Sequence, residues 1–333
     1  MKVVITGGAG FLGQQLIRAL CARGRLTDAA GEEREIEQIV AIDQGHTQRL
    51  FVDERVGYVV GDISVPALLK HVLATDTAVL FHLAAVVSGA AEADFDLGMR
   101  VNLDGTRALL DACRLQRAQV KMVFASSVAV FGGALPPVVG DDTAATPQSS
   151  YGVQKLIGEL LVGEFARKGF IDGRAVRLPT IVVRPGKPNA AASSFASGII
   201  REPLAGEEAL CPVEADTALW LLSPQAAIEA LVHAHEVPRA RWDEVTHGRA
   251  LNLPGLTVTV RQMLQALRAV GGEAAVARVK MAPDPRIKAI VQSWPARFDA
   301  ARAAALGFRA DADFDAVVRA YAQAHAAAAG SAT

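Results

Sequence analysis

The chain has 333 residues, 51% of them hydrophobic, and 34 lysines and arginines nearly balance 35 aspartates and glutamates for a formal net charge of −1. This composition is typical of a soluble globular protein and argues against a nucleic-acid-binding protein or a disordered chain. The three cysteines, Cys21, Cys113 and Cys211, share no close spacing, so we expect reduced, inert thiols. With no visible signal peptide and no apolar run suited to a membrane helix, we expect a cytoplasmic protein without membrane partners.

The first predicted strand ends at Thr6 and is followed by a glycine-rich turn and a helix from about Phe11. Residues 8–13 match the GxGxxG pattern, and Gly7, Gly10 and Gly13 also match a GxxGxxG spacing. Such glycines permit a tight turn, bring the backbone close to a pyrophosphate and let the helix pack on the strand. Because helix N-termini carry unpaired N–H groups, we expect a dinucleotide to bind here; a merely structural turn is the alternative.

The second predicted strand, residues 36–42, ends at Asp43. An acid at this strand end accepts hydrogen bonds from the adenine ribose. Asp43 lies further along the chain than the usual spacing of about 20 residues, and the polar loop before the strand can absorb the excess. No basic residue follows until Arg49, so we favour NAD over NADP. A plain turn aspartate is the alternative.

Further strands are predicted at residues 56–60, 78–82, 120–125 and 174–178, with a helix over 92–116. Strands that alternate with helices predict an α/β fold with a doubly wound, Rossmann-type parallel sheet. Its ligand should lie beyond the strand ends, where the glycine turn, Asp43, Ala84 and Ser127 converge. His82 has no second metal-type ligand nearby, and we expect it to be structural.

A helix predicted over residues 147–165 carries Tyr151 and Lys155 four residues apart, so both side chains lie on one helix face. An ammonium about 4 Å from the phenol could supply roughly the 4 kcal/mol needed to lower a tyrosine pKa by about three units. Such a pair is common by chance. Together with Ser127 at the end of the preceding strand, it indicates a hydroxyl–phenol–ammonium site.

Several motifs together resemble the extended short-chain dehydrogenase/reductases, relatives of the nucleotide-sugar epimerases: TGGAGFLG, GDI, HLAA, VNLDGT, SSVAVFG and YGVQK. The resemblance implies that Tyr151 is the catalytic base, Lys155 its electrostatic partner, and Ser127 the hydroxyl that orients the substrate oxygen. The cofactor-binding positions that the motifs and the resemblance indicate are Gly7, Gly10, Phe11, Leu12, Gly13, Asp43, Asp62, Ile63, Leu83, Ala84, Ala85, Asn102, Tyr151, Lys155, Pro179 and Thr180. In this set Asn102 is the asparagine that supports the lysine.

Within that family, residues 84–110, 177–204 and 293–308 resemble the D-erythronate dehydrogenases. The resemblance implies NAD-dependent oxidation of a four-carbon sugar acid at C2 to its 2-oxo acid. Candidate substrate contacts are Ser88, Ser126, Ser127, Tyr151, Asn189, Ser193 and Arg184. A carboxylate requires hydrogen-bond donors or a cation, for which Arg184, Lys187 and Arg201 are candidates.

Two other functions remain open at this point. One is a nucleotide-sugar 4-epimerase that keeps its NAD tightly bound. Against it, Thr217 and Ala218 stand where such enzymes typically carry a basic residue. The other is a non-catalytic NAD-sensing protein, which would need neither Tyr151 nor Lys155.

We expect residues 1–180, with returning segments at about 217–252, to form the NAD-binding domain. Residues 181–330 should form mainly a smaller, interleaved C-terminal α/β lobe that binds the substrate, with helices at 224–235, 260–270 and 313–325. By analogy with the family, helices 92–116 and 147–165 predict a homodimer. The acids Asp311, Asp313 and Asp315 are more typical of a helix N-terminus than of a cation site, so no metal is expected.

Overall fold

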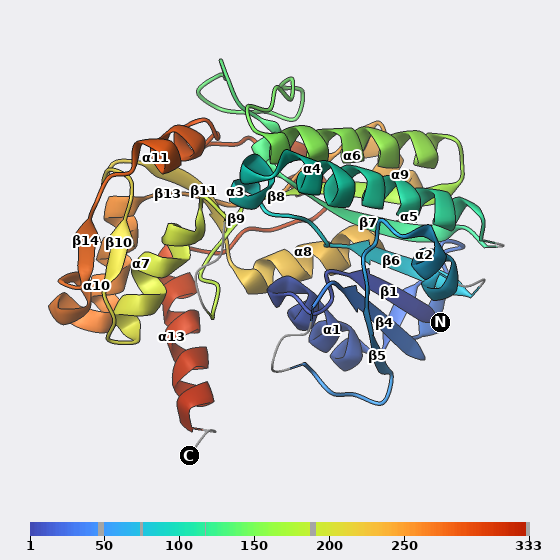
Figure 1. The fold of residues 1–333 in the computed structure, drawn as a ribbon, viewed down its shortest axis with the longest axis horizontal. Helices are drawn as coiled ribbons and strands as arrows, with labels where there is room; N and C mark the ends of the chain where they lie inside the picture. Colours follow the sequence, from blue (N-terminus) through green and yellow to red (C-terminus); the bar gives the residue numbers. More distant parts are fainter. Residues whose placement is uncertain (46–49, 74–75, 117, 187–190, 331–333) are drawn as a thin grey trace.

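The computed structural model describes residues 1–45, 50–73, 76–116, 118–186 and 191–330. Its centre is a seven-stranded sheet in which every neighbouring pair is parallel, in the order β12-β8-β7-β6-β1-β4-β5 (Figure 1). The strands are β1 (Lys2–Thr6), β4 (Gln38–Asp43), β5 (Val56–Val60), β6 (Thr77–His82), β7 (Val120–Ser127), β8 (Ile171–Leu178) and β12 (Leu251–Asn252). The predicted doubly wound α/β fold is confirmed.

Helices cover both faces of this sheet because its strands are apolar on both sides. On one face lie α1 (Phe11–Arg23) and α8 (Pro224–Glu236), which share a buried cluster with Val3 and Ile5 of β1. On the other face lie α2 (Pro66–Val72), α5 (Gly105–Arg114) and α6 (Ser150–Arg167), which share a second cluster with Val4. Alternate residues of β1 therefore serve opposite layers, as a two-residue period requires.

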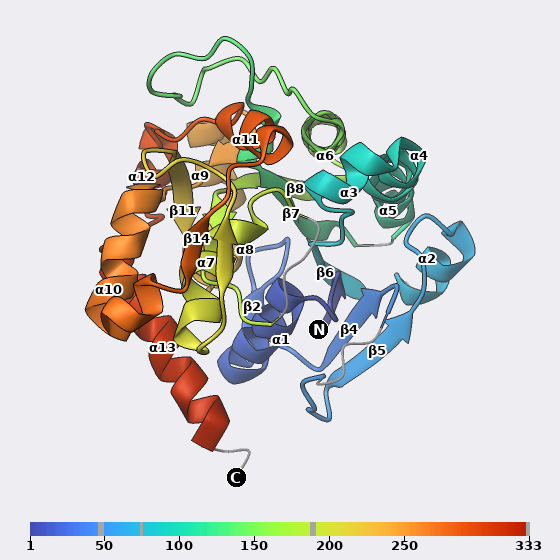
Figure 2. The ribbon, with the colours of Figure 1, turned by 60° about the vertical axis from the view of Figure 1, so that its left-hand side comes forward.

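A smaller lobe is built from the later part of the chain (yellow to red in Figure 1). Strands β9 (Thr180–Ile181), β11 (Ala218–Leu222) and β13 (Leu256–Thr259) form one sheet, and β10 (Ala209–Cys211) pairs with β14 (Val279–Met281). Helices α7 (Ser194–Leu204), α10 (Val260–Val276), α11 (Pro285–Gln292) and α13 (Phe314–Gly330) pack around a third apolar cluster. Figure 2 shows α10 and α13 at the edge of the molecule away from β4 and β5.

The chain passes back and forth between the two parts. After β9 it enters the lobe, and α8, α9 (Arg239–Thr246) and β12 then return to the large sheet. The segment α12 (Ala301–Ala305) contacts β12 and α9. The division into an NAD-binding and a substrate-binding domain stays a prediction about function.

The predicted helix over residues 92–116 is wrong as one continuous element. The structure has α3 (Ser88–Ala93), α4 (Phe95–Gly98), a π-helical segment η1 (Met99–Asp104) and then α5. The break falls at Asp94, whose extended backbone ends α3 and whose carboxylate accepts the Leu97 N–H at 2.9 Å to begin α4.

The polar stretch before Asp43 is an antiparallel hairpin, β2 (Arg25–Thr27) with β3 (Glu33–Glu35). Arg25 and Glu33 pair across it at 2.9 Å, and charged side chains gave no apolar alternation to predict it from. This hairpin accounts for the long spacing between the glycine turn and Asp43.

All three cysteines are free and buried. Among the described residues, no helix is long and apolar enough to cross a membrane.

Candidate active site

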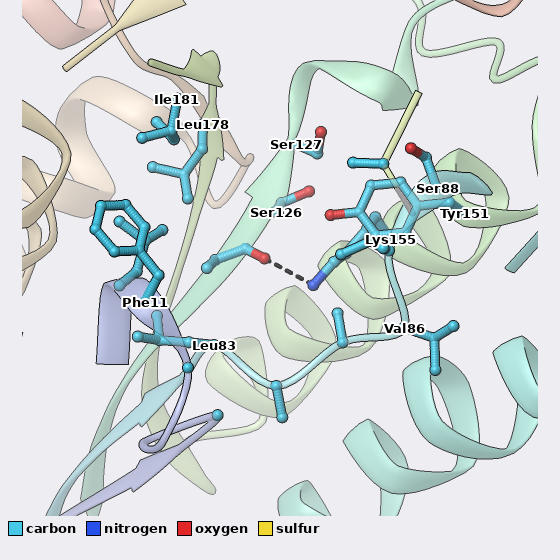
Figure 3. A pocket seen from close by; sticks show the side chains of 18 of the residues that line it. Phe11, Leu83, Val86, Ser88, Ser126, Ser127, Tyr151, Lys155, Leu178 and Ile181 are labelled. Atoms are coloured by element: carbon cyan, nitrogen blue, oxygen red, sulfur yellow. Dashed lines mark hydrogen bonds between the residues drawn. The ribbon is translucent and has the colours of Figure 1, made fainter. Parts of the chain in front are cut away.

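A cavity of about 480 Å³ opens at the carboxyl ends of the central strands, between the sheet and the smaller lobe (Figure 3). Its wall combines the glycine turn, the ends of β4, β6 and β7, the start of α6 and residues of the lobe. From the predicted cofactor set it contains Gly7, Gly10, Phe11, Leu12, Gly13, Asp43, Ile63, Leu83, Ala84, Ala85, Tyr151, Lys155, Pro179 and Thr180. From the predicted substrate set it contains Ser88, Ser126, Ser127, Tyr151, Arg184 and Ser193.

The glycine turn is built for close backbone contact. Gly7 has a φ of +72°, and a Cβ there would lie 2.8 Å from the Ala84 nitrogen. A Cβ on Gly13 would lie 2.2 Å from the Gly7 carbonyl oxygen, so only glycine lets α1 begin this close to the turn. Gly8 instead faces the Ala41 side chain of β4, at 2.5 Å from a Cβ. The GxxGxxG spacing, not Gly8, therefore lines the cavity.

Two features of the turn fit a dinucleotide. The first turn of α1, at Phe11, Leu12 and Gly13, presents N–H groups that have no partner within the helix. Asp43 lies opposite, at the end of β4, with its carboxylate accepting the N–H groups of Ala9 at 3.1 Å and Gln44 at 2.8 Å. Arg49, the first basic residue after Asp43, lies outside the described residues.

Asp62 and Asn102, both predicted cofactor contacts, are held by other partners. Asp62 pairs with Arg100 and accepts the Ser64 N–H at 2.8 Å, while its neighbour Ile63 lines the cavity. Asn102 bonds both backbone groups of Val86, at 2.7 and 3.0 Å, and donates to Gln154 at 2.7 Å. In this structure Asn102 therefore fixes the loop after β6 to α6.

Tyr151 reaches the cavity because the first turn of α6 packs tightly on β7. Ser149 caps this helix by accepting the Gly152 N–H at 3.2 Å. A Cβ on Gly152 would lie 2.2 Å from the Ala129 carbonyl oxygen, so this glycine lets α6 contact the 3-10 turn η2 (Val128–Val130) directly. The phenol thereby points into the cavity near the end of β7 (Figure 3), and the Ser127 hydroxyl lies close enough to lower its pKa.

Lys155 lies one turn further along α6, and contacts with β7 fix the position of its side chain. Its Nζ donates to the Ala125 carbonyl at 2.8 Å, the dashed line in Figure 3. The same atom lies 4.7 Å from the centre of the Phe124 ring and 5.8 Å from that of Tyr151. The predicted pairing of Tyr151 and Lys155 on one helix face is present.

The electrostatics of this pair in the ligand-free protein differ from the expectation. Burial raises the pKa of Tyr151 to about 12, although a hydrogen bond with Ser127 lowers it. Burial also lowers the pKa of Lys155 to about 7, and the charge of Glu159 opposes that change. The expected lowering of the tyrosine pKa is therefore absent here, because desolvation outweighs the hydrogen bond with Ser127.

The predicted substrate contacts come from both parts of the fold. Ser88 accepts the Ala192 N–H at 3.3 Å, and Ser193 and Arg184 line the wall. Ser126 also borders the cavity, but its hydroxyl donates to Glu159. The predicted residues Asn189 and Lys187 lie outside the described residues.

The third cation candidate, Arg201, is not part of the wall. It donates to the Arg184 carbonyl at 2.8 Å and pairs with Glu202. Burial, with a contribution from the Arg201 charge, lowers the pKa of Arg184. No local sequence pattern marks Trp294, which lines the cavity beyond α11. It lies in the segment 293–308, which resembles the D-erythronate dehydrogenases as a whole.

Two side chains expected to be structural have structural partners. His82 is fully buried and bonds Thr6 at 2.7 Å and Thr106 at 2.8 Å. Asp311 accepts the Ser223 N–H at 2.7 Å at the start of α8. Within the described ranges, no group of three or more His, Cys, Asp or Glu side chains could hold a metal ion.

The chain is similar to a known family and to named dehydrogenases. The model of the NAD dependent epimerase/dehydratase family matches residues 3–247. The chain is 58% identical over 321 residues to a D-erythronate dehydrogenase from Cupriavidus necator, covering 96% of this chain and 98% of that one. A D-erythronate dehydrogenase from Haemophilus influenzae is 45% identical over 319 residues, with the same coverage of 96% and 98%.

The fold also matches solved structures. One titled as a nucleoside-diphosphate-sugar epimerase from Agrobacterium tumefaciens is 41% identical, with a TM-score of 0.86, and the match covers 96% of this chain and 92% of that one.

Proposed function

The chain belongs to the NAD-dependent epimerase/dehydratase family, and we propose that it oxidises D-erythronate at C2 to the 2-oxo acid with NAD. Family membership and the two similar dehydrogenases make it an oxidoreductase that uses a nicotinamide cofactor. The observation that carries the proposal is the joint presence of Ser127, Tyr151 and Lys155 in the wall of the cavity that the glycine turn also lines.

Several residues fit NAD. The first turn of α1 would hold the pyrophosphate, and Asp43 would accept hydrogen bonds from the adenine ribose hydroxyls. A 2′-phosphate next to the Asp43 carboxylate would be repelled, which favours NAD over NADP. When bound, the oxidised nicotinamide accepts a hydride and brings a positive charge to the cavity.

The chemistry proposed for this chain is removal of the C2 hydroxyl proton by the Tyr151 phenolate. Ser127 holds the same oxygen, since its hydroxyl lies beside the phenol. Lys155 stabilises the phenolate by its charge, and its own position is fixed by the Ala125 carbonyl.

Arg184 is the residue we propose for the substrate carboxylate. Its backbone is fixed on both sides, by the Ser197 hydroxyl at 3.0 Å and by Arg201 at 2.8 Å. Burial and the Arg201 charge disfavour the charged form of Arg184, and an anionic carboxylate beside its guanidinium would offset both effects.

The substrate is tested by following NADH formation with D- and L-erythronate, D- and L-threonate and UDP-sugars. We expect activity with D-erythronate and a strong preference for NAD over NADP. Activity with none of the four-carbon acids would overturn the substrate, and equal rates with NADP would overturn the role of Asp43.

Tyr151→Phe tests the proposed base. The variant keeps the ring and loses the ionisable oxygen, so kcat should fall by at least about 100-fold, the contribution of a positioned base. NAD binding and the melting temperature should stay close to those of the unmodified protein. Near-normal turnover of the folded variant would contradict the mechanism.

The solved structure titled as a nucleoside-diphosphate-sugar epimerase favours a second candidate, an epimerase that retains its NAD. Against it, Thr217 and Ala218, at the start of β11, provide no basic side chain for a nucleotide diphosphate. Purified protein that carries non-exchangeable NAD and forms no NADH from sugar acids would support the epimerase.

A further inference from the structure

A third residue of α6 continues the line of Tyr151 and Lys155. Glu159 follows Lys155 by four residues, so the three side chains lie on one face of the helix. Tyr151 and Lys155 line the active-site cavity, whereas Glu159 is buried behind it. A buried carboxylate requires partners, and those of Glu159 lead directly to the site.

Glu159 is held by a two-pronged ion pair. Arg177 of β8 donates to its two oxygens, from Nε at 2.9 Å and from Nη2 at 2.7 Å. The guanidinium is itself fixed, because it donates to Asn252 of β12 at 3.2 Å and lies 4.8 Å from the centre of the Phe131 ring. The carboxylate therefore has one well-defined position.

The same carboxylate accepts the hydroxyl of Ser126, the residue next to Ala125 in β7. Since Lys155 donates to the Ala125 carbonyl, Lys155 and Glu159 bind adjacent residues of one strand. Ser127, which contacts Tyr151, follows immediately. Three consecutive residues at the end of β7 thus connect to three successive turns of α6.

We propose that Glu159 is a positioning residue for the reaction: its carboxylate anchors the end of β7 beside Tyr151 and supplies a buried negative charge on the helix face of Lys155. The inference rests on the proposed function for its consequence in catalysis. The effect of Glu159 on the charge of Lys155 can be tested without substrate or cofactor.

The charges around Lys155 support this role. Burial lowers the pKa of Lys155 to about 7, and Glu159 is the group that raises it. On β6, burial and the Lys155 charge hold the pKa of His82 well below its usual range, so that imidazole adds no charge. On β8, Arg177 faces Glu159, and on α6 the phenol of Tyr151 has a pKa raised by burial.

The other elements packed on α6 bring no buried charge to this region. Glu92 of α3 is exposed and accepts the Ser150 N–H, and the exposed Arg100 of η1 pairs with Asp62. On α4 and α5 the charged side chains are exposed or half-exposed: Asp96, Arg107, Asp111 and Arg114. Glu159 is thus the buried acid that faces Lys155 in the described part of the chain.

The test compares Glu159→Gln with Glu164→Gln, which removes an exposed carboxylate of the same helix that pairs with Arg167. The rate of carbamylation of Lys155 by cyanate, followed by mass spectrometry across pH without ligands, reports the neutral amine. In Glu159→Gln the midpoint should fall by about one pH unit, which makes Lys155 up to about tenfold more reactive below the original midpoint. Glu164→Gln should leave it unchanged.

In catalysis, the base limb of the pH profile of kcat/KM should move to lower pH by a similar amount in Glu159→Gln, since Lys155 loses its proton earlier. Ser126→Ala keeps the carboxylate and removes the anchor. It should lower kcat without moving the carbamylation midpoint.

Glu159→Gln leaves the buried Arg177 without its counter-charge and can therefore destabilise the fold. The double variant Glu159→Gln/Arg177→Met removes both charges and serves as the alternative if the single variant does not fold. An unchanged carbamylation midpoint in Glu159→Gln, or in the double variant if the single variant does not fold, would overturn the proposal. Failure of D-erythronate as substrate would leave the carbamylation result intact, so the two failures are distinguishable.

Discussion

Tyr151 shows how far one residue depends on its partners. A phenol with a pKa of about 12 needs a lowering of about five units to act as a base near neutrality, which corresponds to roughly 7 kcal/mol. One ammonium at about 4 Å supplies about 4 kcal/mol at an effective dielectric constant of about 20. Lys155 alone would supply less than this difference, so the proposed mechanism calls for a further positive charge, which the oxidised nicotinamide would bring when bound.

Arg184→Met tests the proposed contact between Arg184 and the substrate carboxylate. Hydrogen bonds to a charged group contribute about 1.5–3 kcal/mol, so the KM for D-erythronate should rise by about 10- to 150-fold. The KM for NAD should hardly change. Arg261→Met, at an exposed arginine paired with Asp216, is the matched control. An unchanged KM for the sugar acid in Arg184→Met would assign the carboxylate to another residue.

Elements differ in how well the sequence predicts them. The central strands were predictable because continuous apolar runs end at polar or glycine residues, as at Thr6 and Asp43. The helix over 92–116 was mispredicted because Asp94 can cap a new helix as well as continue an old one. Helix α7 is not predictable from the sequence, because its small polar residues and Pro203 give no clear apolar period. Its buried face is defined by packing against α10.

The site residues likewise divide into those that local motifs predict and those that depend on tertiary contacts. Residues of the glycine turn and of the YGVQK motif, such as Gly13 and Tyr151, lie in the cavity wall, because the ends of the strands fix their positions. Trp294 and the partners of Asn102 depend on contacts between segments far apart in the sequence, which no local pattern encodes.

The glycine turn makes a prediction for an element. Gly13→Ala places a Cβ 2.2 Å from the Gly7 carbonyl oxygen, so the start of α1 must shift, at a cost of about 1–3 kcal/mol. The affinity for NAD should fall as well. Gly57→Ala, in β5, is the control, because its Cβ would meet open space. Thermal unfolding and NAD titration of both variants check this, and equal behaviour would contradict the packing role.

On the scale of the whole molecule, the cavity lies where two separately packed parts meet. Tyr151 and Lys155 lie on α6, which packs on the large sheet, and the lobe contributes Arg184, Ser193 and Trp294. The proposed base and the proposed carboxylate contact, Arg184, would therefore lie on different parts of the fold. The homodimer stays a prediction; Leu160, 66% exposed on the outer side of α6, offers it an apolar contact.

Two buried histidines link the stability of the fold to pH. Burial holds the pKa values of His82 and His235 well below 6.5 in the folded protein. The unfolded chain then binds more protons below about pH 6.5, so stability should fall on acidification, by up to about 1.4 kcal/mol per histidine at pH 5.5. The measurement is the difference in unfolding free energy between pH 7.5 and pH 5.5.

That difference should shrink in His82→Asn and in His235→Asn, whatever their stability at pH 7.5. His71→Asn, at an exposed site, should retain it. If all three variants lose the same free energy as the unmodified protein, the acid sensitivity has another origin.

The place of Trp294 has a practical consequence. The chain contains three tryptophans, and the other two, Trp220 and Trp242, are buried in the protein interior. Trp294 borders the cavity, so its indole is an intrinsic fluorophore at the site. Occupancy can then be read optically in variants that no longer turn over, which separates loss of binding from loss of chemistry without any added label.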